Sequence, residues 1–202
     1  FHIKMFYSVL NHPWQIVWSD GMFDDGKITR TGWPMEYMAD TLAPYTGLEK
    51  RDIILFPHRI APEKQPEIFK DLQQSLPQYK FVMCQEQQLS KDEYHTLLGS
   101  AKMVFSANLQ ETLGISWYEG ALVDAIPMVP DRLSYSEMAI DDFKYPSAWT
   151  ESFDSYLDAI VDYMENYDNY VPAITQQVTK LKDDYFGCSK LISTIRDRSN
   201  YA

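Results

Sequence analysis

Residues 103–129 read MVFSANLQETLGISWYEGALVDAIPMV and contain two short apolar runs that flank a turn at Gly114. The runs Met103–Ser106 and Pro127–Val129 are typical of strands buried on both faces of a parallel sheet. Gly114 permits a tight backbone turn, and the helix expected after it would present free amides that favour an anion. The order strand, turn, helix, strand predicts an α/β fold.

The same alternation extends toward the N-terminus. Apolar runs at Ile53–Phe56 and Lys80–Cys84 predict two further strands, and apolar residues recur at helical spacing over 68–76 between them. Ser90 and Glu93 have the spacing of a capping box, so another helix is predicted to follow. We therefore expect a Rossmann-like parallel sheet with helices on both faces.

The two ends of the chain differ from this central part. Two apolar stripes over residues 151–186 predict two amphipathic helices, so a helical tail begins at about residue 151. Residues 15–30 predict a hairpin or an irregular segment. We expect one Rossmann-like domain over residues 47–202. Residues 1–46 would be a leading segment or a remnant of an N-terminal domain or interdomain linker.

A metal site is the alternative to turns in the first part of the chain. Asp20, Asp24 and Asp25 supply carboxylates, but the spacing of a calcium loop is absent and Asp-Gly is first of all turn chemistry. Cys84 and Cys188 lie far apart and lack metal-ligand spacing, so neither a zinc site nor a disulfide scaffold is expected. We expect no bound metal.

The overall charge limits the classes of partner. The 202 residues carry 18 Lys and Arg against 29 Asp and Glu, and this net charge of −11 opposes binding of a nucleic-acid backbone by the whole chain. No apolar run approaches the roughly 20 residues that span a bilayer, and the first residues lack the profile of a signal peptide. We expect a cytoplasmic protein without a membrane span. The missing initiator Met suggests a piece of a longer chain.

Charged residues follow the predicted strands, where the ligands of an open parallel sheet bind. Arg59 and Lys64 come after the first strand and could clamp a diphosphate. Glu111 and Glu119 flank the turn at Gly114, so two carboxylates could accept bonds from sugar hydroxyls beside the anion site. The loop at 130–137 closes the same crevice from the last predicted strand.

In this order, the residues resemble the C-terminal, nucleotide-sugar-binding domain of the retaining glycosyltransferases of family four, which have the two-Rossmann-domain architecture called GT-B. The resemblance covers about residues 50–140. Arg59 and Lys64 are five positions apart after a strand, Glu111 and Glu119 have seven residues between them, and a strand opening with Pro127 follows. The segments 56–59 and 64–66, with 32–34 upstream, also resemble glycosyltransferases encoded by bacteriophages, which would place the protein in the host cytoplasm.

The resemblance implies a role for each matching residue. Arg59 and Lys64 would hold the diphosphate of the donor, with a UDP-sugar favoured, and would act in catalysis with Glu111, which faces the donor sugar. Glu119 would bind the ribose, and the base would lie near Gln88 and Leu89. The implied donor-binding set is Arg59, Lys64, Gln88, Leu89, Glu111, Thr112, Leu113, Gly114, Ile115, Ser116 and Glu119. No metal or other cofactor is required.

The resemblance also implies a missing partner. In this family an N-terminal domain binds the acceptor, so this chain alone is expected to bind a nucleotide sugar but to transfer it poorly. Modified DNA, a saccharide and a lipid remain open as acceptors. The family commonly has a glycine shortly before the strand at Pro127, where Asp124–Ile126 stands here, and a glycine pair after it, where this chain has Leu133 and Ser134. These departures leave the sugar open.

Two other functions are alternatives. A non-catalytic module could use the same fold and its 14 Tyr and 5 Trp residues to bind a protein partner. A nucleotide-sugar 2-epimerase would need acids and histidines in the crevice. His58 and His95 are near the relevant loops, but a hydrogen-bonded structural role is the favoured interpretation of His58.

Overall fold

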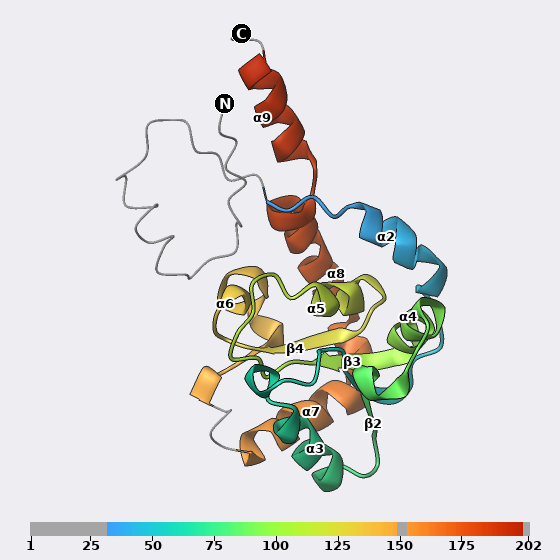
Figure 1. Cartoon of the computed structure of the whole chain (residues 1–202). Helices are drawn as coiled ribbons and strands as arrows, with labels where there is room; N and C mark the ends of the chain where they lie inside the picture. The colour runs from blue at the N-terminus through green and yellow to red at the C-terminus, as the bar shows by residue number, and fades with distance from the viewer. Residues whose placement is uncertain (1–31, 149–152, 200–202) are drawn as a thin grey trace.

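Five parallel strands form the centre of the fold in the computed structural model, which describes residues 32–148 and 153–199 (Figure 1). Their order across the sheet is β2-β1-β3-β4-β5. In chain order the strands are β1 Arg51–Phe56, β2 Lys80–Met83, β3 Ala101–Phe105, β4 Ile126–Pro130 and β5 Lys144–Tyr145. The first four match the predicted apolar runs, and the predicted Rossmann-like α/β class is confirmed.

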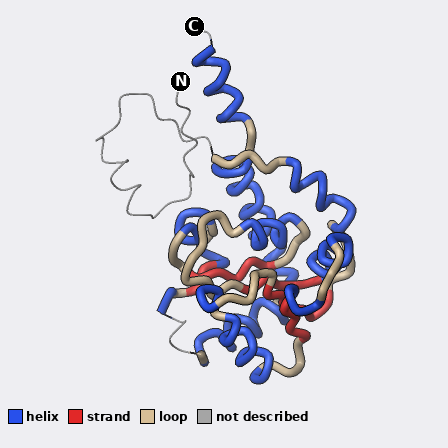
Figure 2. The backbone as a smooth tube through the Cα atoms, viewed as in Figure 1, coloured by secondary structure: helices blue, strands red, loops and turns tan. Residues whose placement is uncertain are grey.

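Helices cover both faces of this sheet (Figure 2). They are α2 Tyr37–Leu42, α3 Pro66–Ser75, α4 Lys91–Ser100, α5 Ile115–Leu122, α6 Ser134–Met138, α7 Asp154–Glu165, α8 Tyr167–Leu181 and α9 Ser189–Ser199. The predicted capping box begins α4, because the Ser90 hydroxyl accepts from the Glu93 amide and the Glu93 carboxylate accepts from the Ser90 amide.

Alternate side chains of the strands enter two separate layers of the core. Ile53 and Leu55 of β1 belong to the layer that contains side chains of α2, α4 and α5. Ile54 and Phe56 face the opposite layer with side chains of α3 and α7, which lie below the sheet in Figure 1. Because both faces of the sheet are covered, residues that point to either face are apolar, and the strands are continuous apolar runs in the sequence.

Some elements were not predicted. Strand β5 has two residues and α6 has five, so neither is long enough to show a periodic pattern. Helices α7 and α8 match the two predicted tail helices, but α8 continues into a π-helical turn at Lys182–Phe186. The predicted hairpin at 15–30, with Asp20, Asp24 and Asp25, lies outside the described residues.

The first described residues dock onto this π-helical turn. The amide of Trp33 donates to the Tyr185 carbonyl at 2.7 Å, and the amide of Met35 donates to the Phe186 carbonyl at 2.8 Å. Gly32 has φ +72, and a Cβ there would collide with the Tyr185 backbone. Segments about 150 residues apart in sequence are therefore held together.

Candidate functional site

The candidate site lies where the strand order reverses direction. In the order β2-β1-β3-β4-β5, the chain goes from β1 to β2 on one side and from β3 to β4 and β5 on the other, so the order reverses between β1 and β3. Ligands of open α/β sheets bind at such a point, outside the carboxyl ends of the strands. The loops after β1 and β3 meet here, because the Leu109 amide donates to the Glu63 carbonyl at 2.7 Å.

Lys64 and Glu111 are brought together between these loops. The Lys64 ammonium lies 3.0 Å from Oε2 of Glu111 and also donates to the Gln110 carbonyl at 2.7 Å. Their side chains are only 12% and 15% exposed. Burial raises the pKa of Glu111, but the charge and hydrogen bond of Lys64 outweigh it, so the net pKa is below its ordinary value. Glu111 is therefore ionised at neutral pH.

The second carboxylate oxygen of Glu111 lies against the turn before α5. Oε1 accepts from the amides of Thr112 at 2.9 Å and Gly114 at 3.0 Å. The amide of Gly114, which we expected to bind the ligand, is thus bonded to Glu111, because a nearby carboxylate is attracted to unpaired amides at the positive end of a helix. Ile115 and Ser116 are the first residues of α5, where amides have no acceptor within the helix.

Gly114 makes the predicted turn. Its φ is +67, in the left-handed region, and a Cβ would collide with the indole of Trp117. The Trp117 indole is fully buried and donates to the Leu113 carbonyl at 3.2 Å. Both the backbone conformation and the packing therefore require glycine at this position.

His58 lies beside this pair at the end of β1. Its side chain is 6% exposed, with Nε2 2.6 Å from the Ser106 hydroxyl and Nδ1 3.5 Å from the Ser116 hydroxyl. Burial, together with the charge of Lys64, lowers the pKa of His58 to about 4, although Glu111 opposes the shift. The imidazole is therefore neutral. His95, by contrast, packs in α4 against the rings of Tyr45 and Tyr94.

Arg59 does not join Lys64 and Glu111. Its side chain is 67% exposed and forms an ion pair with Glu63, four residues along the chain. Because an exposed guanidinium takes the nearest carboxylate at little cost, this pair is easily exchanged for a ligand.

A cleft of about 360 Å³ lies beside His58 and is lined by both residues predicted to contact the base. Its walls are Pro57, His58, Arg59, Cys84, Gln85, Gln88, Leu89 and Tyr94. Glu119 does not line this cleft but is bonded to a residue that does, since the Tyr94 hydroxyl donates to its Oε2 at 3.0 Å. Burial raises the pKa of Glu119, partly offset by this bond. Arg59, Gln88 and Leu89 thus share one cleft, and Glu119 is linked to it by the Tyr94 bond.

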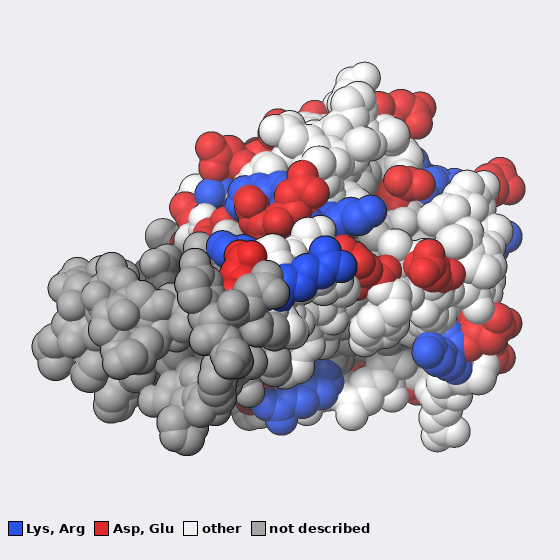
Figure 3. Space-filling model, turned by 90° about the horizontal axis from the view of Figure 1, so that it is seen from above, with Lys and Arg blue, Asp and Glu red and all other residues white. Residues whose placement is uncertain are grey.

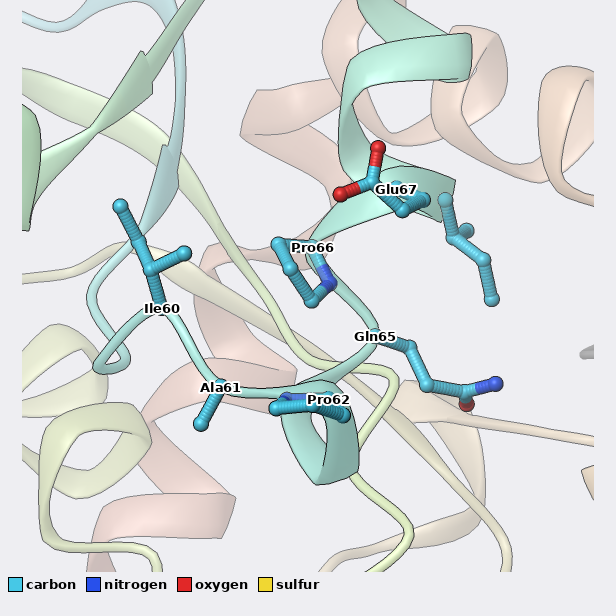
Figure 4. Close-up of a pocket in the computed structure, with 7 residues that line it drawn as sticks. Ile60, Ala61, Pro62, Gln65, Pro66 and Glu67 are labelled. Carbon is cyan, nitrogen blue, oxygen red and sulfur yellow. The ribbon is translucent and has the colours of Figure 1, made fainter.

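A second cavity, of about 480 Å³, opens along the loop between β1 and α3 (Figure 4). Mostly apolar residues line it, namely Ile60, Ala61, Pro62, Gln65, Pro66, Glu67 and Ile68. Sequence reasoning did not identify this cavity, although the two prolines and the exposed Ile60 lie next to the predicted Lys64.

Sequence reasoning also missed Arg132 and Asn108. The Arg132 guanidinium donates to the carbonyls of Ala107 and Asn108 at 2.7 and 2.8 Å and to the Gln65 side chain at 3.1 Å, so it joins the loops after β1, β3 and β4. The Asn108 amide donates to Glu111 Oε2 at 2.9 Å and to the Tyr135 hydroxyl at 2.8 Å. Neither residue belongs to a periodic pattern that would have indicated its role.

The described residues contain no cluster of three or more His, Cys, Asp or Glu side chains arranged to hold a metal. Within 32–148 and 153–199, no helix has the length and apolarity needed to cross a bilayer. On the face in Figure 3, Lys and Arg side chains of the described part are interspersed with Asp and Glu rather than gathered into one basic area.

Comparison with known proteins supports the fold. No protein-family model matches the sequence, and no curated protein matches it. Among solved structures, the crystal structure of TarM, a glycosyltransferase of the GT-B fold, is similar, with a TM-score of 0.62 and 13% sequence identity. The match covers 91% of this chain and 41% of TarM, so the chain spans about two fifths of that length. The described domain therefore shares its fold with part of TarM.

Proposed function

We propose that the chain is the donor-binding domain of a retaining glycosyltransferase and holds a nucleotide-diphosphate sugar, with a UDP-sugar favoured. The observation that carries the proposal is the buried Lys64–Glu111 pair at the N-terminus of α5, at the switch point of a glycosyltransferase-like fold. A fixed ammonium beside unpaired helix amides suits a diphosphate.

The donor would extend along the cleft from Lys64. The ammonium of Lys64 and the first amides of α5 would hold the diphosphate, and Arg59 would leave Glu63 to neutralise the charge that develops as the sugar departs. Glu111 would face the sugar. The base would lie against Gln88 and Leu89 in the 360 Å³ cleft.

The acceptor would bind to a separate N-terminal domain. Modified DNA, a saccharide and a lipid are all compatible with this arrangement. The chain alone would bind the donor but transfer its sugar poorly, because the residues that hold the acceptor would be missing.

Calorimetric titration with UDP- and GDP-sugars tests the proposal. We expect wild-type binding and a loss of about tenfold or more in affinity for Lys64→Met, because a buried charge pairs with the diphosphate. Lys70→Met is the matched control, since Lys70 is 41% exposed and pairs with Glu67 on α3. A wild-type chain that binds no nucleotide sugar contradicts the proposal.

A non-catalytic interaction module is the second candidate. Three large apolar side chains around the site are exposed, namely Ile60 at 42%, Leu109 at 48% and Ile115 at 43%. Such a rim suits a protein partner. Light scattering distinguishes the two functions, because an oligomer that ignores nucleotide sugars supports the module.

A further inference from the structure

Tyr94 lines the cleft and is bonded to Glu119. It lies in the first turn of α4, where its amide donates to the Ser90 carbonyl at 2.9 Å directly after the capping box. Its side chain lines the cleft together with Gln88 and Leu89. The hydroxyl crosses to the neighbouring helix α5 and donates to Glu119 Oε2 at 3.0 Å.

We propose that Tyr94 is a positioning residue for Glu119, whose carboxylate it orients so that the ribose hydroxyls of a bound nucleotide are recognised. The inference rests on the proposed function and on the ribose contact that the family resemblance implies for Glu119. One carboxylate oxygen is held by the tyrosine hydroxyl, and the other is then presented in a fixed direction.

The chemistry of the pair supports this direction of the bond. Burial and the neighbouring carboxylate raise the pKa of Tyr94 far above its usual range, so its hydroxyl keeps its proton and donates it. Burial raises the pKa of Glu119 above its ordinary value, and the Tyr94 bond and the Lys91 charge oppose this rise in part, toward the ionised form that accepts from sugar hydroxyls. Without the phenol, this carboxylate would lose the one side-chain hydrogen bond that fixes its rotamer in the described structure.

Tyr94→Phe removes the hydroxyl and keeps the ring. Calorimetry compares UDP with 2′,3′-dideoxy-UDP, which lacks the ribose hydroxyls. We expect the wild-type chain to prefer UDP by about tenfold, as one charge-assisted hydrogen bond allows, and Tyr94→Phe to reduce this ratio toward one. Inorganic pyrophosphate should bind both proteins equally, because the diphosphate site is unchanged.

Two further variants serve as comparisons. Tyr167→Phe removes a hydroxyl that donates to the Asp124 carbonyl from α8, so the ratio should stay at the wild-type value. Glu119→Gln keeps an acceptor for Tyr94 but removes the charge, and the ratio should fall as in Tyr94→Phe. Melting temperatures of Tyr94→Phe and Tyr167→Phe, each of which removes one hydroxyl, show whether a change in the ratio comes from a loss of folding.

The outcomes separate the inference from the proposed function. A wild-type chain that binds neither nucleotide overturns the proposed function and the inference with it. A wild-type chain that binds UDP and dideoxy-UDP equally overturns the inference alone, since Glu119 then does not recognise ribose. A wild-type preference that Tyr94→Phe retains in full overturns the role of Tyr94 alone. A preference lost in Tyr94→Phe and kept in Tyr167→Phe supports both.

Discussion

The imidazole of His58 is a buried base whose charge state depends on the fold. Its pKa is about 4 in the folded chain, against an ordinary value of 6.5, because burial and Lys64 disfavour the cation while Glu111 favours it. Between these values the unfolded chain binds the proton more readily than the folded chain does. The contribution of His58 to the free energy of unfolding is therefore fully present above about pH 6.5 and is lost as the pH falls toward 4.

This difference predicts a measurable dependence on pH. From pH 7 to pH 5, the wild-type chain should lose about 2 kcal/mol of unfolding free energy that His58→Gln does not lose. Urea unfolding of both proteins at the two pH values measures the difference. The carboxyl groups with lowered pKa lose their contribution mainly at lower pH, and His95, whose pKa is also lowered, is common to both proteins. Equal losses in the two proteins would contradict the assignment.

The loop between β4 and α6 contains the most strained backbone near the site. Leu133 has φ 55 and ψ −140, a combination that side chains with a Cβ rarely adopt. Glycine adopts such dihedrals without a steric penalty.

Leu133→Gly should therefore stabilise the chain. We expect the free energy of unfolding to rise by about 1 kcal/mol, since relief of strain exceeds the greater flexibility of glycine in the unfolded chain. Leu133→Ala is the control, because alanine keeps the strained φ while it shortens the side chain. Denaturant unfolding compares the three proteins. An equal change in both variants would show that backbone strain is not the cause.

At the scale of the whole molecule, the contact between residues 32–36 and the turn at 182–188 joins distant parts of the chain. Gly32→Ala should break this contact, because its Cβ collides with the Tyr185 backbone. Gly47 provides a matched control, since its φ is +73 and a Cβ there would meet nothing within 4 Å. We expect Gly47→Ala to cost about 1 kcal/mol through backbone strain alone.

Hydrogen exchange distinguishes the two glycine variants. The amides of Trp33 and Met35 donate across this contact, so Gly32→Ala should make them exchange faster than in the wild type. Gly47→Ala should leave their exchange relative to global unfolding unchanged. Unaltered protection of both amides in Gly32→Ala would refute the predicted disruption.

The parts of the site that could be predicted are those set by topology. Lys64 and Glu111 follow adjacent parallel strands, whose carboxyl ends share one edge of the sheet, so their proximity follows from the strand pattern. The pairing of Arg59 with Glu63 depends on a side-chain rotamer. The bond from Tyr94 to Glu119 depends on how α4 packs against α5. No local pattern in the sequence encodes either of these two side-chain contacts. Strand β5 was missed for another reason, because its two residues are too few to show a periodic pattern.

The carboxylate of Glu111 already occupies the amides of Thr112 and Gly114. An incoming anion that takes these amides replaces bonds of similar strength. Its net binding free energy is therefore only the difference between its own bonds to the amides and those of the displaced carboxylate. A singly charged ion offers no more than Glu111 itself does. A group with several negative charges can outcompete it, because it also engages Lys64 and the neighbouring helix amides at once. The protein's own acid should therefore discriminate against monovalent anions such as chloride or acetate.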